Sequence, residues 1–418
     1  MITLYPFQIP HVEQMVYLLE QYPVVGDISP TGSGKTVASL EIARRIVTKL
    51  NPSQRRIIIV CPPSLIAQWK STAEKYNIQV EVYSLYVLDK IDLSIPFFLI
   101  VDECHYFKNV NGRNIKLKYV LRGAHNTILM SATLIDRKDQ ASNYASLFRT
   151  NDFVSRCSAM KIEYPTDVSV QYFHVKCNDD ELVDYKAGYK SIMQSGWLQH
   201  EGLQYHFPGG LFTKGVRGVH NALFSSLVRI VKEKLSDNSL TKCIAVVHFK
   251  HHFTALQEIF PDALVINGTT TLKERNTKLV EFNEPSDKSR LIIVSDQVGG
   301  VGIEMDDKDG KFPRQMVVLP TTNAMNFVQL IGRIQRVKTK SNSKVLVIQP
   351  QRLKTYFKTQ IEKKKACLEA VCNFPEIKFV FDKGHWCSSY EECTKHVTDA
   401  ITSIVMDYIG VDSCGCLV

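Results

Sequence analysis

Short apolar runs alternate with longer segments of helical periodicity along most of the chain. The apolar runs cover residues 57–60, 97–101 and 127–130 in the first half, and residues 243–247, 264–266, 291–294, 315–319 and 345–348 in the second. Most are rich in β-branched residues, which is typical of parallel strands buried on both faces. Helical patterns, such as residues 37–50, separate them. This alternation predicts an α/β fold of doubly wound lobes, each built on a parallel sheet.

Two changes of pattern divide the chain further. Residues 177–237 are helical and loop-like, with a Phe-Pro-Gly-Gly stretch at 207–210, and after Pro350 the chain becomes helical and basic, with three lysines at 363–365. We therefore expect an N-terminal lobe at residues 1–176 and a helical insertion and hinge at 177–237. A C-terminal lobe at 238–350 and a helical, basic extension at 351–418 complete the expected organisation.

The composition is that of a folded globular protein, with 44% apolar and 22% charged residues. The net charge of +9 permits binding to a phosphate backbone but is weak evidence for it. No apolar run approaches the ~20 residues of a membrane span, and no signal peptide is evident. We therefore expect a cytoplasmic or nuclear protein without a membrane partner. The eleven scattered cysteines are then expected to be free thiols.

Residues 29–36, which read Ser-Pro-Thr-Gly-Ser-Gly-Lys-Thr, follow an apolar stretch and precede a helical pattern. This is the context of a loop that cradles phosphates with its backbone N–H groups. We expect Lys35 to reach the β- and γ-phosphates of ATP and Thr36 to bind Mg²⁺. Ser29 replaces the first glycine of the usual pattern. The expected nucleotide-binding residues of the loop are Gly32, Ser33, Gly34, Lys35 and Thr36.

An acidic pair, Asp102-Glu103, ends the apolar run at 97–101. A carboxylate at the carboxyl end of a strand, downstream of a phosphate loop, is well placed to bind Mg²⁺. We expect Asp102 to hold the metal and Glu103 to orient and deprotonate the attacking water. The segment Ser131-Ala132-Thr133 also follows a predicted strand, and it fits a relay between nucleotide and nucleic acid.

Two arginines, Arg333 and Arg336, lie three residues apart, on one face of an expected helix. They flank no matching acids in the sequence, so surface ion pairing is a poor explanation for them. An arginine inserted at a γ-phosphate raises hydrolysis by ~10³-fold or more. A phosphate loop and a distant arginine pair predict a nucleotide in a cleft between two lobes. Since closure of such a cleft can drive movement, the pattern indicates an ATP-driven motor.

Together these segments resemble superfamily 2 helicases and translocases, and in particular the Swi/Snf-like branch in the minimal form that large DNA viruses and phages encode. The resemblance extends over residues 5–347. Besides the phosphate loop, it rests on residues 5–8, 57–69, 102–105, 108–109, 267–268, 274–275, 282–283, 298–303 and 329–336.

The resemblance implies two tandem RecA-like lobes that use ATP and Mg²⁺. It implies that Gln8 reads the adenine, and that Gly302 and Gln329 also contact the nucleotide. The nucleic-acid contacts that it implies are Pro62, Ser64, Lys108, Gly299 and Gly300.

Several residues depart from the Swi/Snf pattern. The phosphate loop is more similar to that of branch-migration and repair helicases, Ser131-Ala132-Thr133 stands where remodellers usually have Gly-Thr-Pro, and Glu304 replaces a usual Asn. We therefore favour a motor that translocates on double-stranded or branched DNA and remodels, reanneals or branch-migrates it. We expect a monomer, recruited by a protein partner, acting in the host cell or virion if a virus encodes it.

Three alternatives stay open. One is a helicase that separates the strands of DNA or RNA. A scaffold that binds ATP without hydrolysing it has no use for the full set of Lys35, Glu103, Arg333 and Arg336. A small-molecule kinase has no use for the second lobe.

Near the C-terminus, the spacing of the histidines and cysteines at 385, 387, 393, 396, 414 and 416 fits no standard zinc template, so we expect free thiols there.

Overall fold

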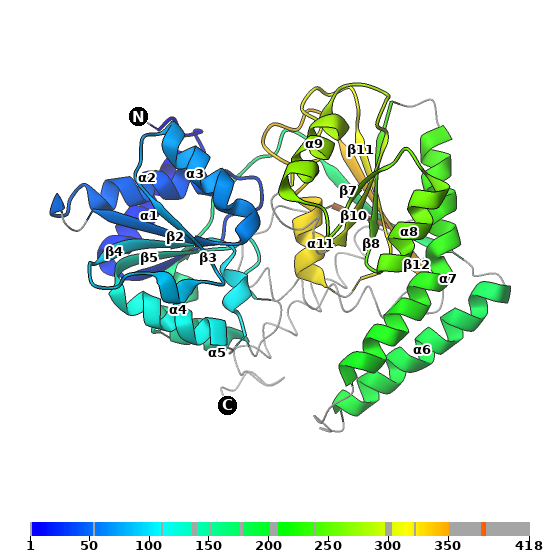
Figure 1. Ribbon diagram of the computed structural model, residues 1–418, viewed down its shortest axis with the longest axis horizontal. Helices are drawn as coiled ribbons and strands as arrows, with labels where there is room; N and C mark the ends of the chain where they lie inside the picture. The colour runs from blue at the N-terminus through cyan, green and yellow to red at the C-terminus, as the bar shows by residue number, and fades with distance from the viewer. Residues whose placement is uncertain are drawn as a thin grey trace, which may run out of the picture. The chain divides into compact units, whose positions relative to one another are not determined.

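The computed structural model describes residues 2–52, 55–109, 112–135, 140–150, 152–175, 179–200, 208–236, 240–296, 303–321, 323–350 and 378–381 (Figure 1). The chain forms two compact units, the first ending at Glu163 and the second beginning at Tyr164. Each unit is an α/β lobe with its own sheet.

The first lobe contains a six-stranded sheet in the order β3-β2-β4-β5-β1-β6, in which every pair is parallel. Its strands are β1 (Val24–Asp27), β2 (Arg56–Cys61), β3 (Glu81–Ser84), β4 (Phe97–Val101), β5 (Ala124–Met130) and β6 (Cys157–Ser158). Its α-helices are α1 (Gln8–Gln21), α2 (Lys35–Val47), α3 (Ile66–Lys75), α4 (Gly112–Gly123) and α5 (Ala141–Phe148). Short 3-10 helices are η2 (Pro63–Leu65), η3 (Leu88–Lys90), η4 (Cys104–Phe107) and η6 (Val154–Arg156).

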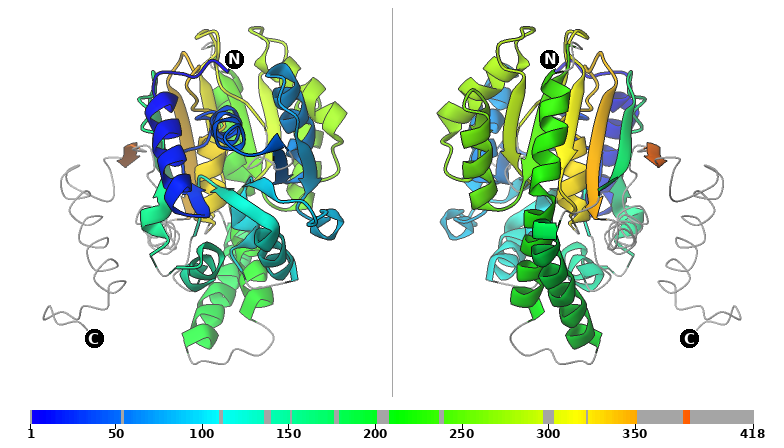
Figure 2. Two further views of the ribbon diagram at one scale, coloured as in Figure 1. Left: turned by 90° about the vertical axis from the view of Figure 1, so that its left-hand side faces the viewer. Right: turned by 90° about the vertical axis from the view of Figure 1, so that its right-hand side faces the viewer.

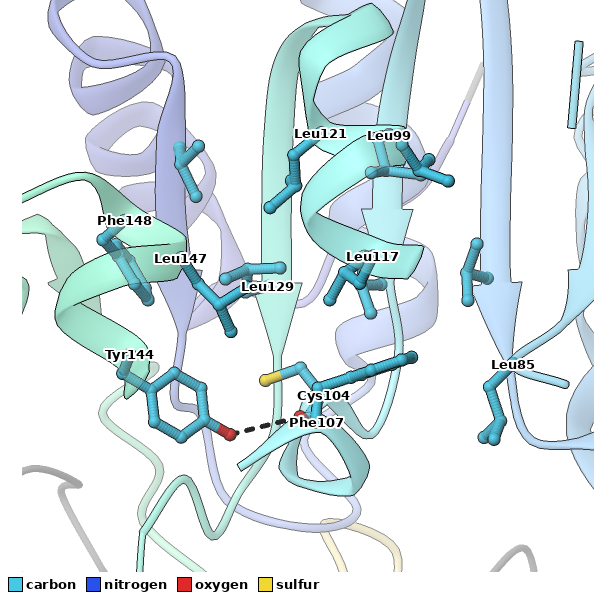
Figure 3. Close-up of a cluster of buried hydrophobic side chains, with 14 of the residues drawn as sticks. Leu85, Leu99, Cys104, Phe107, Leu117, Leu121, Leu129, Tyr144, Leu147 and Phe148 are labelled. Atoms are coloured by element: carbon cyan, nitrogen blue, oxygen red, sulfur yellow. Dashed lines mark hydrogen bonds between the residues drawn. The ribbon is translucent and has the colours of Figure 1, made fainter. Parts of the chain in front are cut away.

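A cluster of buried side chains joins β4 and β5 to α4 and α5 (Figure 3). It also fixes η4, the turn that follows the acidic pair. The Tyr144 hydroxyl donates to the Cys104 carbonyl at 3.1 Å, and the amides of Asn114 and Asn143 both donate to the carbonyl of Phe107, at 2.9 and 2.7 Å. Side chains of α4, which follows soon after η4, and of α5, 36 to 40 residues from their partners, therefore hold the backbone on which the candidate site is built.

The second lobe contains a seven-stranded sheet in the order β13-β7-β12-β11-β8-β10-β9, again with every pair parallel. Its strands are β7 (Val168–Val175), β8 (Lys242–Val247), β9 (Leu264–Ile266), β10 (Leu291–Ser295), β11 (Arg314–Val318), β12 (Ser343–Pro350) and β13 (Lys378–Phe381). Its helices include α6 (Asp179–His200), α7 (Pro208–Ser236), α8 (Lys250–Ile259), α9 (Leu272–Asn283) and α11 (Ala324–Ile331). Two doubly wound parallel sheets confirm the predicted fold class.

The start of the second lobe differs from the expected organisation. Residues 168–175 were expected in the first lobe, but they form β7, which pairs with β12 over its whole length in the second sheet. Two helices, α6 and α7, occupy the expected insertion and lie side by side (Figures 1 and 2). Because buried residues of α7, such as Leu223 and Leu227, share a core with β8 and β10, this helix is part of the second lobe rather than a separate hinge.

Glycines set the close approach of α6 and α7. A Cβ at Gly218 would lie 2.8 Å from the Asp184 carbonyl oxygen, and one at Gly215 would lie 2.8 Å from that of Gly188. Any larger side chain at these positions would push the helices apart.

Among the described residues, no helix is long and apolar enough to cross a membrane. Of the expected C-terminal extension, the described part is the strand β13; the lysines at 363–365 and the terminal histidines and cysteines lie outside the described residues.

Candidate nucleotide and nucleic-acid sites

The predicted phosphate loop joins β1 to α2 in the first lobe. Gly32 and Gly34 have positive φ angles of 76° and 80°, so the loop adopts a left-handed backbone that glycine tolerates without strain. The Lys35 ammonium donates to the carbonyls of Ser29 and Pro30, at 2.8 and 3.0 Å. Lys35 is also the first residue of α2, whose N-terminus adds a partial positive charge. The loop therefore has the shape and charge of an anion site.

Ser29, the departure from the usual glycine, has a structural role. It is fully buried, and its hydroxyl oxygen accepts a hydrogen bond from the backbone N–H of Met160 at 2.9 Å. Its own N–H donates to Asp27 Oδ1 at 2.9 Å. A glycine at this position would make the second contact but not the first. The hydroxyl thus ties the start of the loop to the segment that follows β6.

Beneath the loop lies a buried pair that sequence reasoning missed. Asp27 Oδ2 is 3.3 Å from His11 Nε2, and both side chains are almost completely buried. Burial alone would raise the pKa of Asp27, but the charge and hydrogen bond of His11, with the charge of Lys35, outweigh it and hold this pKa below its usual value. The signal in the sequence was an acid at the end of an apolar run, in front of a phosphate loop.

Gln8, the expected adenine reader, contacts the phosphate loop. Its Nε2 donates to the Ser33 carbonyl at 3.0 Å, and its Oε1 accepts from the Tyr5 N–H at 2.9 Å. The rings of Tyr5 and Phe7 stack beside it, with 5.5 Å between centroids. A Cβ at Gly34 would lie 2.5 Å from Gln8 Nε2, so this glycine also makes room for the glutamine.

The acidic pair lies at the carboxyl end of β4, as predicted. Asp102 is buried, with Oδ1 accepting from the Glu103 N–H and Oδ2 accepting from the indole N–H of Trp69, each at 2.9 Å. Burial and the charge of Glu103 raise the pKa of Asp102 to about 6, while the charge of Lys35 acts in the opposite direction. The strands β1 and β4 both pair in parallel with β5, so the phosphate loop and the acidic pair follow strands that end at the same edge of the sheet.

Glu103 belongs to a chain of polar contacts. Its Oε2 lies 3.2 Å from His105 Nδ1, which lies 3.1 Å from the hydroxyl of Ser131. That hydroxyl also accepts from the Thr133 N–H at 3.1 Å. Glu103 has a left-handed backbone with φ of 51°, uncommon for a residue other than glycine. The structure thus brings the segment at 131–133 into contact with the acidic pair, although its role as a relay is still a prediction.

The expected nucleic-acid contacts of the first lobe follow two neighbouring strands. Pro62 and Ser64 follow β2, and Lys108 directly follows η4, the turn after β4. Pro62 is buried, whereas Ser64 and Lys108 are half-buried. Gly299, Gly300 and Gly302 of the second lobe lie outside the described residues.

We expected the arginine pair on one face of a helix, but the structure places it outside α11. The helix α11, which includes the buried Gln329, ends at Ile331, and Gly332 caps it. Arg333 and Arg336 therefore lie in the turns that follow the helix. Here the N–H of Arg333 bonds to the Leu330 carbonyl at 3.0 Å, so the chain tightens rather than continuing as an α-helix.

No acidic residue stands close to Arg336 in the sequence, but the fold gives it an acidic partner. Its Nη1 lies 3.2 Å from Glu304 Oε1, and its Nη2 donates to the Ile303 carbonyl at 3.1 Å. Glu304 binds Lys308 on its other side, at 2.7 Å. Burial raises the pKa of Glu304, but Arg336 and Lys308 outweigh it and hold the pKa below its usual value. Glu304, at a position where the Swi/Snf-like pattern usually has Asn, thus forms an ion pair with Arg336.

In the described part of the chain, no group of three or more histidine, cysteine or acidic side chains is arranged to hold a metal ion. The donor set that fits Mg²⁺ is smaller: the Thr36 hydroxyl and the Asp102 carboxylate. Oxygen donors suit this cation. Each Asp102 oxygen accepts one hydrogen bond from the described residues and so keeps acceptor capacity.

No family model matches the chain. A protein of Acanthamoeba polyphaga mimivirus, named as a candidate ATP-dependent RNA helicase, is 31% identical over 119 residues, which are 28% of this chain and 20% of the viral protein. The chain therefore matches about a fifth of the length of this relative.

Solved structures share the fold. S. cerevisiae Dbp5 bound to RNA and ADP BeF3 aligns over 96% of this chain and 98% of its own, with a TM-score of 0.52 and 13% identity. A single-residue variant of Dbp5, in the same complex, has a TM-score of 0.51 and 14% identity over the same shares of the two chains. The Sulfolobus solfataricus SWI2/SNF2 ATPase core with dsDNA gives a TM-score of 0.36. The chain thus shares the fold of two RecA-like lobes with the Dbp5 structures, and 119 of its residues are similar to a viral protein named as a helicase.

Proposed function

We propose that the chain is a nucleic-acid-stimulated ATPase that uses hydrolysis to move along nucleic acid. The observation that carries the proposal is the convergence at one edge of the first sheet. The phosphate loop follows β1 and the acidic pair follows β4, and both strands pair in parallel with β5. The carboxyl edge of a parallel sheet is where ligands bind in such folds.

In this proposal each residue has a separate task. The loop N–H groups and Lys35 bind the phosphates, while Gln8 contacts the base. Thr36 and Asp102 hold Mg²⁺, which neutralises charge on the phosphate oxygens. Glu103 takes a proton from the attacking water, and His105 fixes the orientation of its carboxylate. Arg333 and Arg336 supply positive charge to the γ-phosphate.

For the substrate we favour duplex or branched DNA, with translocation rather than strand separation as the outcome. The support is the Swi/Snf-like pattern of the sequence, including the segments around Lys108 and residues 329–336. A second candidate is an RNA helicase. Two observations favour it: the viral relative carries that name, and the Dbp5 structures of similar fold contain RNA.

A comparison of ATPase rates with different nucleic acids separates these candidates. The protein is assayed with duplex DNA, single-stranded DNA, forked DNA and RNA. The salt concentration is the same in each assay, and so is the concentration of nucleic acid, counted in nucleotide units. Stimulation by duplex DNA without strand separation supports the translocase. Stimulation by RNA with release of a labelled strand supports the RNA helicase. An ATPase rate that no nucleic acid changes would contradict both.

A further inference from the structure

The buried hydrogen bond between Trp69 and Asp102 connects two parts of the first lobe with different expected roles. Trp69 lies in α3, which follows directly on the segment Pro62–Leu65, where nucleic acid is expected to bind. Asp102 is the expected metal ligand. The indole N–H of Trp69 donates to Asp102 Oδ2 at 2.9 Å, and Trp69 is only 1% exposed.

The carboxylate of Asp102 has two anchors of different kinds. Oδ1 is held by the N–H of Glu103, its neighbour in the chain, and Oδ2 by Trp69, 33 residues away. The Asp102 backbone is fixed by the sheet, since its N–H donates to the Val60 carbonyl at 2.8 Å. Because Trp69 lies in α3, a shift of this helix would change the hydrogen bond between the indole and the Asp102 carboxylate.

The connection from the expected nucleic-acid loop to Trp69 is short and regular. The Leu65 N–H donates to the Pro62 carbonyl at 2.9 Å, and the 3-10 turn η2 continues without a break into α3. Ser64 is half-buried and Pro63 exposed, so this turn is accessible to a ligand. A displacement of the turn would move Trp69 with it, because a tryptophan buried in the core has little freedom to adjust its rings.

We propose that Trp69 is a positioning residue that transmits nucleic-acid binding at residues 62–64 to the metal-binding carboxylate of Asp102. The inference rests on the proposed function and deepens it. It assigns part of the stimulation by nucleic acid to a path inside the first lobe, separate from any movement of one lobe against the other. In this role Trp69, which is 1% exposed, acts through Asp102.

The test is the variant Trp69→Phe in the full-length protein, with Trp197→Phe as the matched control. Phenylalanine keeps an aromatic ring at the position but removes the N–H. We expect the Mg²⁺ concentration for half-maximal binding of a fluorescent ATP analogue to rise by about 10-fold or more, as for other partners that orient metal ligands. We also expect the fold stimulation of ATPase by nucleic acid to fall, while the affinity for nucleic acid, measured by anisotropy, stays unchanged. A merely structural role would not separate these quantities.

A second measurement does not depend on the folding of that variant. The native protein has three tryptophans, and the variants Trp197→Phe and Trp386→Phe identify the indole N–H signal of Trp69 in a ¹⁵N NMR spectrum by elimination. We expect this signal to shift when nucleic acid binds without nucleotide.

The outcomes distinguish this inference from the proposed function. If nucleic acid stimulates the native ATPase but leaves the Trp69 signal unmoved, or if Trp69→Phe keeps native Mg²⁺ dependence and stimulation, the positioning role is wrong and the motor stands. If nucleic acid does not stimulate the native enzyme at all, the proposed function fails and the positioning role with it.

Discussion

Glu304 and Arg336 form an ion pair in the second lobe, with 3.2 Å between Oε1 and Nη1. Since a γ-phosphate and Glu304 would compete for the same guanidinium, we expect the ion pair to restrain Arg336. Glu304→Gln removes the charge and should raise the ATPase rate without nucleic acid several-fold, and so lower the fold stimulation. The control is Lys308→Gln, which removes the other partner of Glu304. A basal rate that is the same in Glu304→Gln and in the native protein would mean that the ion pair restrains nothing.

Arg336→Ala tests the other side of the same pair. We expect binding of ATP and of nucleic acid to stay nearly native, while stimulated turnover falls by ~10³-fold, the scale of arginine fingers in phosphoryl transfer. The measurement is the fold stimulation of ATPase in native and variant protein at saturating nucleic acid. Equal stimulation would show that Arg336 does not act at the γ-phosphate.

Glu103→Gln separates ATP binding from hydrolysis. Glutamine keeps the size of the side chain but cannot accept the proton of the attacking water, and loss of a general base lowers rates by roughly 10²- to 10⁴-fold. We expect a fluorescent ATP analogue to bind as tightly as to the native protein, while steady-state turnover collapses. Near-native hydrolysis would remove Glu103 from the active site.

Binding of nucleic acid should depend strongly on salt and little on base sequence, because the expected contacts are to phosphates. The affinity of Lys108→Ala should be lower across all sequences, and the slope of log K against log salt should be reduced by about one. Lys49, which forms a surface ion pair with Glu20 at 2.7 Å, supplies the control Lys49→Ala. A Lys108→Ala slope equal to that of the control would take Lys108 out of the interface.

His220 in α7 and His248, which directly follows β8, should make stability depend on pH. Burial lowers the pKa of His220 to about 4, against about 6.5 in an unfolded chain. Between these values the unfolded chain binds a proton that the folded chain does not, so stability falls as pH drops below 6.5, by on the order of 3 kcal/mol once pH 4 is passed. His220→Gln, whose amide can still donate to the Pro320 carbonyl, should flatten this loss in urea unfolding measured from pH 7 to 4.

His248 provides a control of opposite sign. Its hydrogen bond to Asp296, at 2.8 Å, raises its pKa. A raised pKa contributes stability that is fully present below pH 6.5 and is lost as pH rises through the folded value. His248→Gln should therefore lower stability by a constant amount below pH 6.5 and remove a gain of stability on acidification above it, whereas His220→Gln changes the slope below pH 6.5. Parallel pH curves for the two variants would contradict the assignment of both groups.

The sequence predicted the positions of those segments whose pattern lies in consecutive residues. The phosphate loop and the acid pair at 102–103 depend on local spacing and on the strand before them, and both lie where expected. The contacts that escaped prediction join distant positions, such as Ser29 with Met160 or Trp69 with Asp102. Nothing in either segment alone indicates its partner.

Each wrong prediction has an identifiable cause in the sequence. The segment at 168–175 alternates polar and apolar residues over part of its length, so it lacked the continuous apolar run by which the other strands were identified. The helix before Arg333 ends at Ile331 and the chain tightens in the turn after it, which the three-residue spacing of the arginines does not reveal. The acidic partner of Arg336 is 32 positions upstream, too far for inspection of its neighbours to find it.

The Ser29 hydroxyl bonds to the backbone of Met160 at 2.9 Å, and the first lobe ends at Glu163. The phosphate loop is thus tied to the last stretch of chain before the second lobe begins. A rearrangement of the loop around triphosphate would therefore act directly on the segment around Met160, through this hydrogen bond. A chain with glycine at position 29 would keep the bond from the Ile28 N–H to the Ser158 carbonyl, at 2.9 Å, but would lose the contact between the first residue of the loop and Met160.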